Sequence, residues 1–297
     1  MYRETLPPRQ LGVWLASISP VAIQLAAAEG WRSAAITSGI CILAVWAIWQ
    51  WGSFGRWISV GAYILLTIVV GQFLRESAVM WSGNSDPWVP LLLLGLALWS
   101  ALKGASAAAR VGCVLFWAML MIYPLVFGAA LRDLNWEWAI AEGRSSGGQL
   151  AVLLLLPGLG KILQKKGRTP GAGVLPYILG VIGTILTLGL RCDNFYELSK
   201  SIDLFGAVKH FEAVVFSAAT VGWFLLLSYC LSLCGGLGEG RPSVIMGALV
   251  MAAWMLCDMH IQYNILIIFG TIFWVLLPIL AQVVGTQKKM KKSGKTS

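Results

Sequence analysis

The stretch AVLLLLPGLGKIL, residues Ala151–Leu163, starts as a membrane helix and then contains residues that interrupt one. Its first part, Ala151–Leu156, is entirely apolar, and Pro157, Gly158 and Gly160 follow at once. Proline removes a backbone hydrogen bond and glycine weakens a helix, so we expect an interruption here. Within a bilayer, irregular backbone is tolerated only where it lies against protein or lines a wet cavity. The stretch therefore predicts a functional break in a membrane helix.

A second stretch, WLASISPVAIQL at Trp14–Leu25, carries a similar break with Ser17, Ser19 and Pro20. This break lies in the first apolar run of the chain, and the break at Pro157 lies in the sixth. Each half of five runs thus begins with an interrupted helix, and because five is odd, the second half has the inverted orientation. Interrupted helices at corresponding positions of two halves indicate a transporter-like binding site.

The composition of the chain is that of an integral membrane protein. Of its 297 residues, 58% are hydrophobic and 12% are charged, whereas globular proteins carry about 25% charged residues. It also contains 15 Trp, a residue enriched at membrane interfaces. Most of its apolar runs are close to the roughly 20 residues that a helix needs to cross the hydrocarbon. The ten runs lie near Leu11–Ala28, Ser33–Trp51, Trp57–Leu74, Trp88–Leu102, Val111–Leu131, Gln149–Leu163, Val174–Leu190, Ala207–Cys234, Ser243–Cys257 and Ile261–Val284.

The distribution of charge predicts the orientation of these ten spans. If the N-terminus is cytoplasmic, 15 of the 22 Lys and Arg residues fall on the inside, with only Glu4 and Glu239 among the 13 acidic residues. An excess of Lys and Arg marks cytoplasmic loops. We therefore expect both termini in the cytoplasm. The Lys-rich tail after Val284 is expected to contact anionic membrane lipid, and no nucleic-acid partner is expected.

The chain is predicted to form a single transmembrane domain over residues 1–297. Its first repeat spans about 11–131, its second repeat about 149–284, and a basic cytoplasmic tail follows at 285–297. In the polar segment before the eighth run, the stretch FYELSKSIDLF at Phe195–Phe205 alternates polar and apolar residues at helical spacing. This pattern predicts a short amphipathic helix over the outer end of the molecule.

Three longer stretches carry a family likeness. They are PPRQLGVWLASISPVAIQL at Pro7–Leu25, LKGASAAARVG at Leu102–Gly112 and NFYELSKSIDLFGAVKHFEAVVFSAATVGWFL at Asn194–Leu225. Together with Pro278 in the last run and the basic tail, they resemble the spore germination permease family, the B subunits of spore nutrient-germinant receptors. This family belongs to the amino acid–polyamine–organocation superfamily, and the likeness covers nearly the whole chain.

The resemblance implies an all-α integral membrane protein with about ten transmembrane helices. The implied fold is the LeuT-like 5+5 inverted repeat, in which helices one and six are broken. It also implies a location in the spore inner membrane and a hetero-oligomer with two other receptor subunits. One of these subunits would be membrane-anchored with soluble domains, and the other would be a lipoprotein.

The two breaks predict a small-ligand site between the first and sixth spans, because glycine admits close approach to the backbone and helix N-termini attract carboxylates. The candidates are Ser17, Ile18, Ser19 and Pro20 in span one and Leu156, Pro157, Gly158, Leu159 and Gly160 in span six. Spans three and eight are expected to line the same cavity, which adds Tyr63, Ser217 and Thr220. Alternatively, Pro20 merely kinks its helix, and the last three residues only pack against neighbours.

Other chemistries find little support in the sequence. The six Cys residues lack the His or second Cys pair that a zinc site needs. The chain has two His and no nucleophile with an obvious base, so we expect no enzyme, no catalytic residues, no metal and no cofactor. In the first five runs the strongest polar residues are Gln24 and Gln72, and no charge lies clearly mid-span. Asp258 and His260 are interpreted as solvated residues near the outer interface.

We therefore predict a permease-like subunit of a spore germinant receptor, which binds a small nutrient such as an amino acid and helps to trigger germination. One alternative is a stand-alone amino-acid transporter of the same fold. Another is a degenerate scaffold subunit that binds no ligand.

Overall fold

The backbone is helical almost throughout the described part of the chain. The structure is a computed structural model that describes residues 6–19, 21–22, 31–82, 87–132, 134–140, 149–164, 171–190, 211–238, 240–257 and 259–293. Within these ranges the only β-structure is an isolated bridge between Leu6 and Gln164. The predicted amphipathic helix at Phe195–Phe205 and the break residue Pro20 lie outside the described residues.

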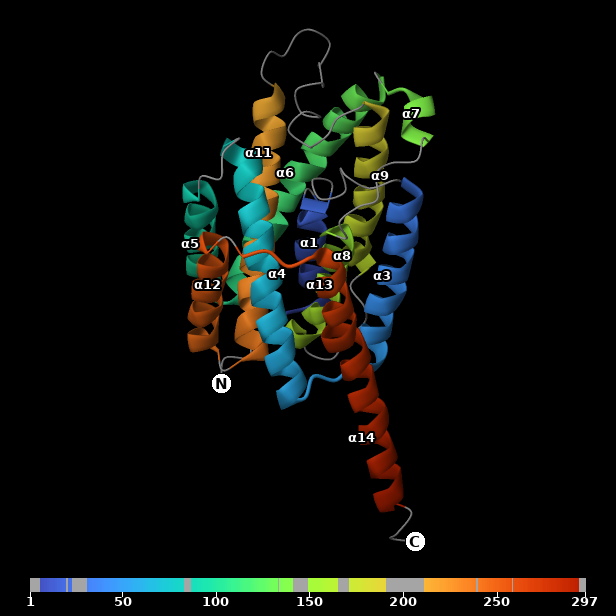
Figure 1. The fold of residues 1–297 in the computed structure, drawn as a ribbon, viewed down its shortest axis with the longest axis vertical. Coiled ribbons are helices and arrows are strands. Elements are labelled where there is room, and N and C mark those ends of the chain that lie inside the picture. The colour runs from blue at the N-terminus through green and yellow to red at the C-terminus, as the bar shows by residue number, and fades with distance from the viewer. Residues whose placement is uncertain are drawn as a thin grey trace.

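The first half of the chain runs up and down the molecule as a series of helices (Figure 1). They are α1 (Pro8–Ser17), α3 (Trp31–Trp51), α4 (Arg56–Ser82), α5 (Trp88–Lys103) and α6 (Ala105–Arg132). Pro8 suits the first turn of α1, where its missing N–H has no helical partner to lose. Gly104, with φ of 115°, lets the chain reverse between α5 and α6 in one residue.

The second half repeats this order after the short helix α7 (Trp136–Ile140). Its elements are α8 (Gln149–Leu159), the 3₁₀ helices η1 (Gly160–Leu163) and η2 (Gly171–Val174), α9 (Leu175–Gly189), α11 (Phe211–Leu237), α12 (Arg241–Leu256), α13 (Tyr263–Gly270), the π-helix η3 (Thr271–Leu276) and α14 (Leu277–Ser293). Each of the ten predicted apolar runs contains a described helix.

The helices pack in two groups that mix the two halves of the chain. One group contains α4, α5, α11 and α12; in the other, α3 packs along α8 and α9, and α1 joins them through η2 while also packing along α6. In the first group α4 packs along α12 and α5 packs along α11. The third helix of each half thus contacts the fourth helix of the other half. This reciprocal pairing is what an inverted repeat predicts.

A glycine permits the close contact between α4 and α12. A Cβ atom on Gly71 would lie 2.7 Å from the Cβ of Trp254 and 3.1 Å from the carbonyl oxygen of Met251. Both atoms belong to rigid parts of α12, so they have little freedom to move away. Any larger residue at this position would push the two helices apart.

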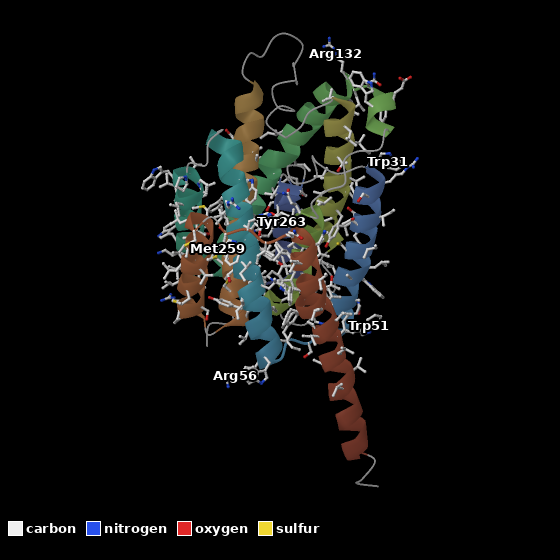
Figure 2. The ribbon with its side chains drawn as sticks, viewed as in Figure 1. Trp31, Trp51, Arg56, Arg132, Met259 and Tyr263 are labelled. Carbon is white, nitrogen blue, oxygen red and sulfur yellow. The ribbon has the colours of Figure 1, made fainter. Side chains whose placement is uncertain are left out.

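Several helices have the length and the surface of membrane spans. Five described helical segments are long and apolar enough to cross a membrane, namely Trp31–Trp51, Arg56–Arg75, Ala105–Ile122, Ser217–Leu237 and Tyr263–Gly285. Outward-facing side chains such as Leu43, Leu92 and Val114 are large, apolar and exposed. Figure 2 places Trp31 and Trp51 at opposite ends of α3, where membrane interfaces favour Trp.

Candidate functional site

The first predicted break is present in the structure. Helix α1 ends at Ser17, and Ile18 forms a turn in which its N–H donates to the carbonyl of Leu15 at 3.2 Å. The Ser17 hydroxyl donates to the carbonyl of Trp14 at 2.6 Å, and the Ser19 hydroxyl donates to the carbonyl of Ala16. Serine hydroxyls that bond back to the preceding turn bend a helix. The hydroxyl groups of Ser17 and Ser19 are therefore already paired with carbonyl groups of α1.

The second break starts later than the sequence suggests. Helix α8 continues through Pro157 and Gly158 to Leu159, and the chain then tightens into the 3₁₀ turn Gly160–Leu163. Pro157 lies inside the last turn of α8, where it cannot donate a helical hydrogen bond to the carbonyl four residues earlier. After the 3₁₀ turn the chain becomes extended, and the N–H of Leu6 donates to the carbonyl of Leu163 at 2.8 Å.

Side chains from three other helices bind the carbonyl groups near the end of α8. The Tyr177 hydroxyl of α9 donates to Leu154 at 2.6 Å, and the Tyr229 hydroxyl of α11 donates to Leu156 at 3.2 Å. The indole N–H of Trp49 in α3 donates to Pro157 at 3.3 Å. These aromatic residues were not among the predicted site residues. The sequence offered one signal for them: each has a polar atom on an aromatic ring within an apolar run. Such an atom usually finds a hydrogen-bond partner when it is buried.

Lys161 also has a defined role at this break. It lies in the 3₁₀ turn after α8, and its ammonium group donates to the carbonyl of Ile48 at 3.0 Å. Ile48 is in the last turn of α3, where the helix dipole favours a positive charge. Lys161 thus joins the end of α3 to the break in the sixth span.

Trp14 and Tyr229 connect the two interrupted helices through α11. Their rings meet edge to face with centroids 5.4 Å apart, and the Trp14 indole donates to the carbonyl of Leu225 at 3.3 Å. Both rings are fully buried. A Cβ atom on Gly160 would lie 2.8 Å from the Tyr229 hydroxyl, so this position requires glycine. Tyr229 therefore lies between the breaks and contacts residues of both spans.

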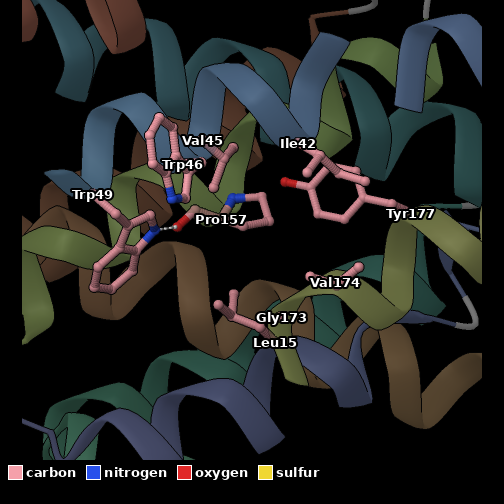
Figure 3. A pocket seen from close by; sticks show the side chains of 9 residues that line it. All are labelled: Leu15, Ile42, Val45, Trp46, Trp49, Pro157, Gly173, Val174 and Tyr177. Atoms are coloured by element: carbon pink, nitrogen blue, oxygen red, sulfur yellow. Dashed lines mark hydrogen bonds between the residues drawn. The ribbon is translucent and has the colours of Figure 1, made fainter. Parts of the chain in front are cut away.

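A cavity of about 90 Å³ lies inside the second helix group, beside both breaks. Its lining residues come from α1, α3, α8, η2 and α9, and they are Leu15, Ile42, Val45, Trp46, Trp49, Pro157, Gly173, Val174 and Tyr177. The wall is almost wholly apolar. Figure 3 shows Pro157 and Tyr177 on the cavity wall and the hydrogen bond from Trp49 to Pro157. Pro157 is the one lining residue among the predicted candidates.

The other span-six candidates face protein rather than this cavity. A Cβ atom on Gly158 would lie 2.6 Å from the Cδ1 atom of Ile48 and 3.5 Å from the Cγ2 atom of Val45, so Gly158 faces α3. The side chains of Leu156 and Leu159 are buried in the core. In span one, Ile18 is likewise buried. The structure thus brings the break residues close to the cavity but leaves most of them in protein contacts.

The three candidates from spans three and eight lie apart from the cavity lining. Tyr63 is at the contact of α4 with α12, where its hydroxyl donates to the carbonyl of Ser243 at 2.9 Å. In α11, Ser217 is exposed and Thr220 is half-buried. Tyr63 therefore belongs to the packing of the first helix group, and a ligand role for these three residues stays a prediction.

Gln72 makes a paired contact with the chain before α13. Its amide nitrogen donates to the carbonyl of Ile261 at 2.9 Å, and its amide oxygen accepts the N–H of Ile261 at 3.1 Å. The same nitrogen lies 3.3 Å from the Nδ1 atom of His260. This buried amide satisfies both backbone groups of Ile261 and fastens α4 to the start of the tenth span.

The comparisons with known proteins identify the fold. No family model matches the chain, and no curated protein matches it. Among solved structures it is similar to Mhp1, a nucleobase-cation-symport-1 family transporter in a closed conformation with bromovinylhydantoin bound. Sequence identity is 16%, the match covers 92% of this chain and 76% of Mhp1, and the TM-score is 0.52. The fold is LeuT-like.

This result confirms the predicted fold class, an all-α inverted repeat with interrupted first and sixth helices. The LeuT-like protein is therefore an integral membrane protein with a transporter-like fold. At 16% identity the likeness concerns the fold alone. Membership of the spore germination permease family stays a prediction.

Proposed function

We propose that this LeuT-like protein is a permease-like subunit that binds a small solute beside its interrupted helices α1 and α8. The observation that carries the proposal is that both breaks lie beside Tyr229, which contacts Trp14 of α1 and donates to the carbonyl of Leu156 in α8. In this fold, interrupted helices at corresponding positions form solute sites. Mhp1, which shares the fold, holds bromovinylhydantoin.

The resemblance to germinant-receptor B subunits leads to the finer proposal. The solute is then a nutrient, such as an amino acid, whose carboxylate binds backbone N–H groups at a break. Binding would shift the protein between two arrangements of its helix groups, since a ligand changes an equilibrium only through its different affinities for the two states. Two partner subunits would convert this shift into the germination response in the spore inner membrane.

A stand-alone amino-acid transporter is the second candidate, favoured by the similarity to a transporter. A scaffold subunit without a ligand is the third. It is favoured by the hydrogen bonds that Tyr177, Tyr229 and Trp49 already make with α8. These bonds leave a solute fewer free carbonyl groups than an open break would offer.

Solute binding can be measured by ligand-induced thermal stabilisation of the purified protein with a panel of amino acids, sugars and nucleosides. A ligand that binds only the folded state raises the unfolding temperature. We expect at least one compound to do so, and Ser19→Ala to abolish the shift. The control is Ser38→Ala, which removes another buried hydroxyl, one that donates to the backbone carbonyl of Tyr177 at 3.4 Å. No shift with any compound would favour the scaffold.

Receptor and transporter differ in what the protein does with a bound compound. Uptake of the labelled compound into liposomes containing only this protein would favour the transporter. Loss of germination with that compound in a deletion strain, and co-purification of two further subunits with the tagged protein, would favour the receptor. Absence of both subunits from the purified material would contradict the receptor assignment.

A further inference from the structure

The cavity beside the two breaks opens on the membrane-facing side of the protein. Its most exposed lining residues are Trp46 and Val174, with exposed fractions of 47% and 39%. Trp46 continues the outward stripe of α3 that contains Ile36, Ile40 and Leu43, all large, apolar and exposed. Because α3 is long and apolar enough to cross a membrane, the mouth of the cavity is continuous with the lipid-facing surface.

The interior of the cavity offers an occupant almost no hydrogen-bonding group. The hydroxyl of Tyr177 is bonded to Leu154, and the indole N–H of Trp49 is bonded to Pro157. Apart from Trp46 at the mouth, the remaining lining residues are aliphatic side chains, Pro157 and Gly173. Apolar cavities of this kind stay free of water and take apolar molecules. A polar solute such as an amino acid would leave its charged groups unpaired here.

We propose that this cavity binds the end of a phospholipid acyl chain that enters from the bilayer between Trp46 and Val174. In a membrane the medium at its mouth is hydrocarbon, and an acyl chain supplies the dispersion contacts that the lining of an empty cavity lacks. The proposal depends on the membrane-spanning fold and not on the proposed solute site.

An acyl chain in this position contacts both interrupted helices. Leu15 lies in the last turn of α1 before the break at Ile18, and Pro157 lies in the last turn of α8 before the 3₁₀ turn. The opposite wall belongs to α3 and to the start of α9. One lipid chain thus joins α1, α3, α8 and α9, and Tyr229 of α11 does not line the cavity.

The test is photo-crosslinking of the full-length protein in liposomes that contain phosphatidylcholine with a diazirine near the end of one acyl chain. Adducts are mapped by mass spectrometry of peptides. We expect labelling of 42–49 and 173–177 at several times the level on the exposed stripe of α5 around Leu92 and Leu96. Equal labelling of these regions would overturn the proposal.

Two variants test whether the crosslinked residues are labelled from within the cavity. Val174→Phe fills the mouth and is expected to lower labelling of 42–49 at least threefold. Ile178→Phe is the matched control, because Ile178 is exposed on α9 one turn away and does not line the cavity. It should leave the labelling unchanged. If Val174→Phe does not fold, Ile42→Trp fills the cavity from α3 and has the same expected effect, and unchanged labelling in the folded variant would refute the proposal.

Discussion

At Gly160 the structure has no room for a side chain. A Cβ atom there would lie 2.8 Å from the Tyr229 hydroxyl and 3.3 Å from the ring of Trp49. We expect Gly160→Ala to destabilise the protein by about 1–3 kcal/mol, the usual cost of inserting a methyl group into a packed core. Thermal unfolding in detergent measures this. Gly95→Ala is the control, since Gly95 has open space and lies within α5, where alanine is favourable.

A double variant of Gly160 and Tyr229 tests this contact more sharply. Tyr229→Phe removes the hydroxyl that donates to Leu156, which leaves a buried carbonyl with one donor fewer and costs about 1–3 kcal/mol. It also removes the atom that a methyl group at position 160 would meet first. The double variant with Gly160→Ala is therefore expected to lose less stability than the sum of the two single losses. Fully additive losses would show that Tyr229 is not what excludes a side chain there.

At this scale the sequence predicted the places of the breaks but not the residues that stabilise them. The local effect of proline and glycine on a helix predicted the sixth-span break, which falls at Gly160, after α8 has continued through Pro157 and Gly158. Trp49 and Tyr229, which bind the carbonyls of that break, lie 108 and 73 residues from their partners. No local pattern specifies such contacts, because they exist only after the helices have packed.

At the level of elements, the contact between α4 and the chain before α13 depends on one buried amide. Gln72→Leu removes both hydrogen bonds to Ile261. We expect faster hydrogen exchange at 259–266 and a loss of about 1–3 kcal/mol in stability, because two backbone groups lose their partner. Hydrogen–deuterium exchange of the protein in nanodiscs measures the first effect.

Thr67→Val is the matched variant for Gln72→Leu. Thr67 is also buried on α4, but its hydroxyl donates to the carbonyl of Ile64 in the same helix at 2.8 Å. The exchange rate of 259–266 should therefore stay at the wild-type value. If both variants increased this exchange equally, the effect would come from general loosening of α4 and not from the amide of Gln72.

Element boundaries show where a local reading of the sequence is sufficient. The runs around α3, α5 and α12 were predicted within a few residues, because an apolar helix that crosses lipid has to satisfy its backbone internally. The π-helix at Thr271–Leu276 was not predicted. It sits where Trp274 donates to the carbonyl of Ala62 in α4 at 3.4 Å, a contact that the local sequence does not specify.

At the scale of the whole molecule, the order of spans and their division into two halves followed from counting apolar runs and from the two breaks. The reciprocal pairing of α4 with α12 and of α5 with α11 follows from the inverted symmetry and not from any residue pattern. The lipid-facing mouth of the cavity could not be predicted, because it depends on how α3 and α9 are placed around α8.

The orientation of the molecule in the membrane is the remaining prediction at this scale. Arg56 and Arg132 lie at opposite ends of the molecule (Figure 2), and the Lys-rich end of α14 lies at the same end as Arg56. Because Lys and Arg are concentrated on cytoplasmic segments, the end with Arg56 should face the cytoplasm. A reporter fused after Ser297 and one fused after Trp138, in α7 at the opposite end, can separate the two possibilities.

A fluorescent protein that folds only in the cytoplasm should be bright at Ser297 and dark at Trp138, and alkaline phosphatase should show the reverse. An odd number of spans, those of α8 to α14, separates the two fusion points. The chain therefore returns to the cytoplasmic side after α7. Fluorescence at both points would mean that one of the second-half runs does not cross the bilayer. Phosphatase activity at Ser297 with fluorescence at Trp138 would show that the molecule has the opposite orientation in the membrane. The Lys-rich end of α14 would then lie outside the cytoplasm.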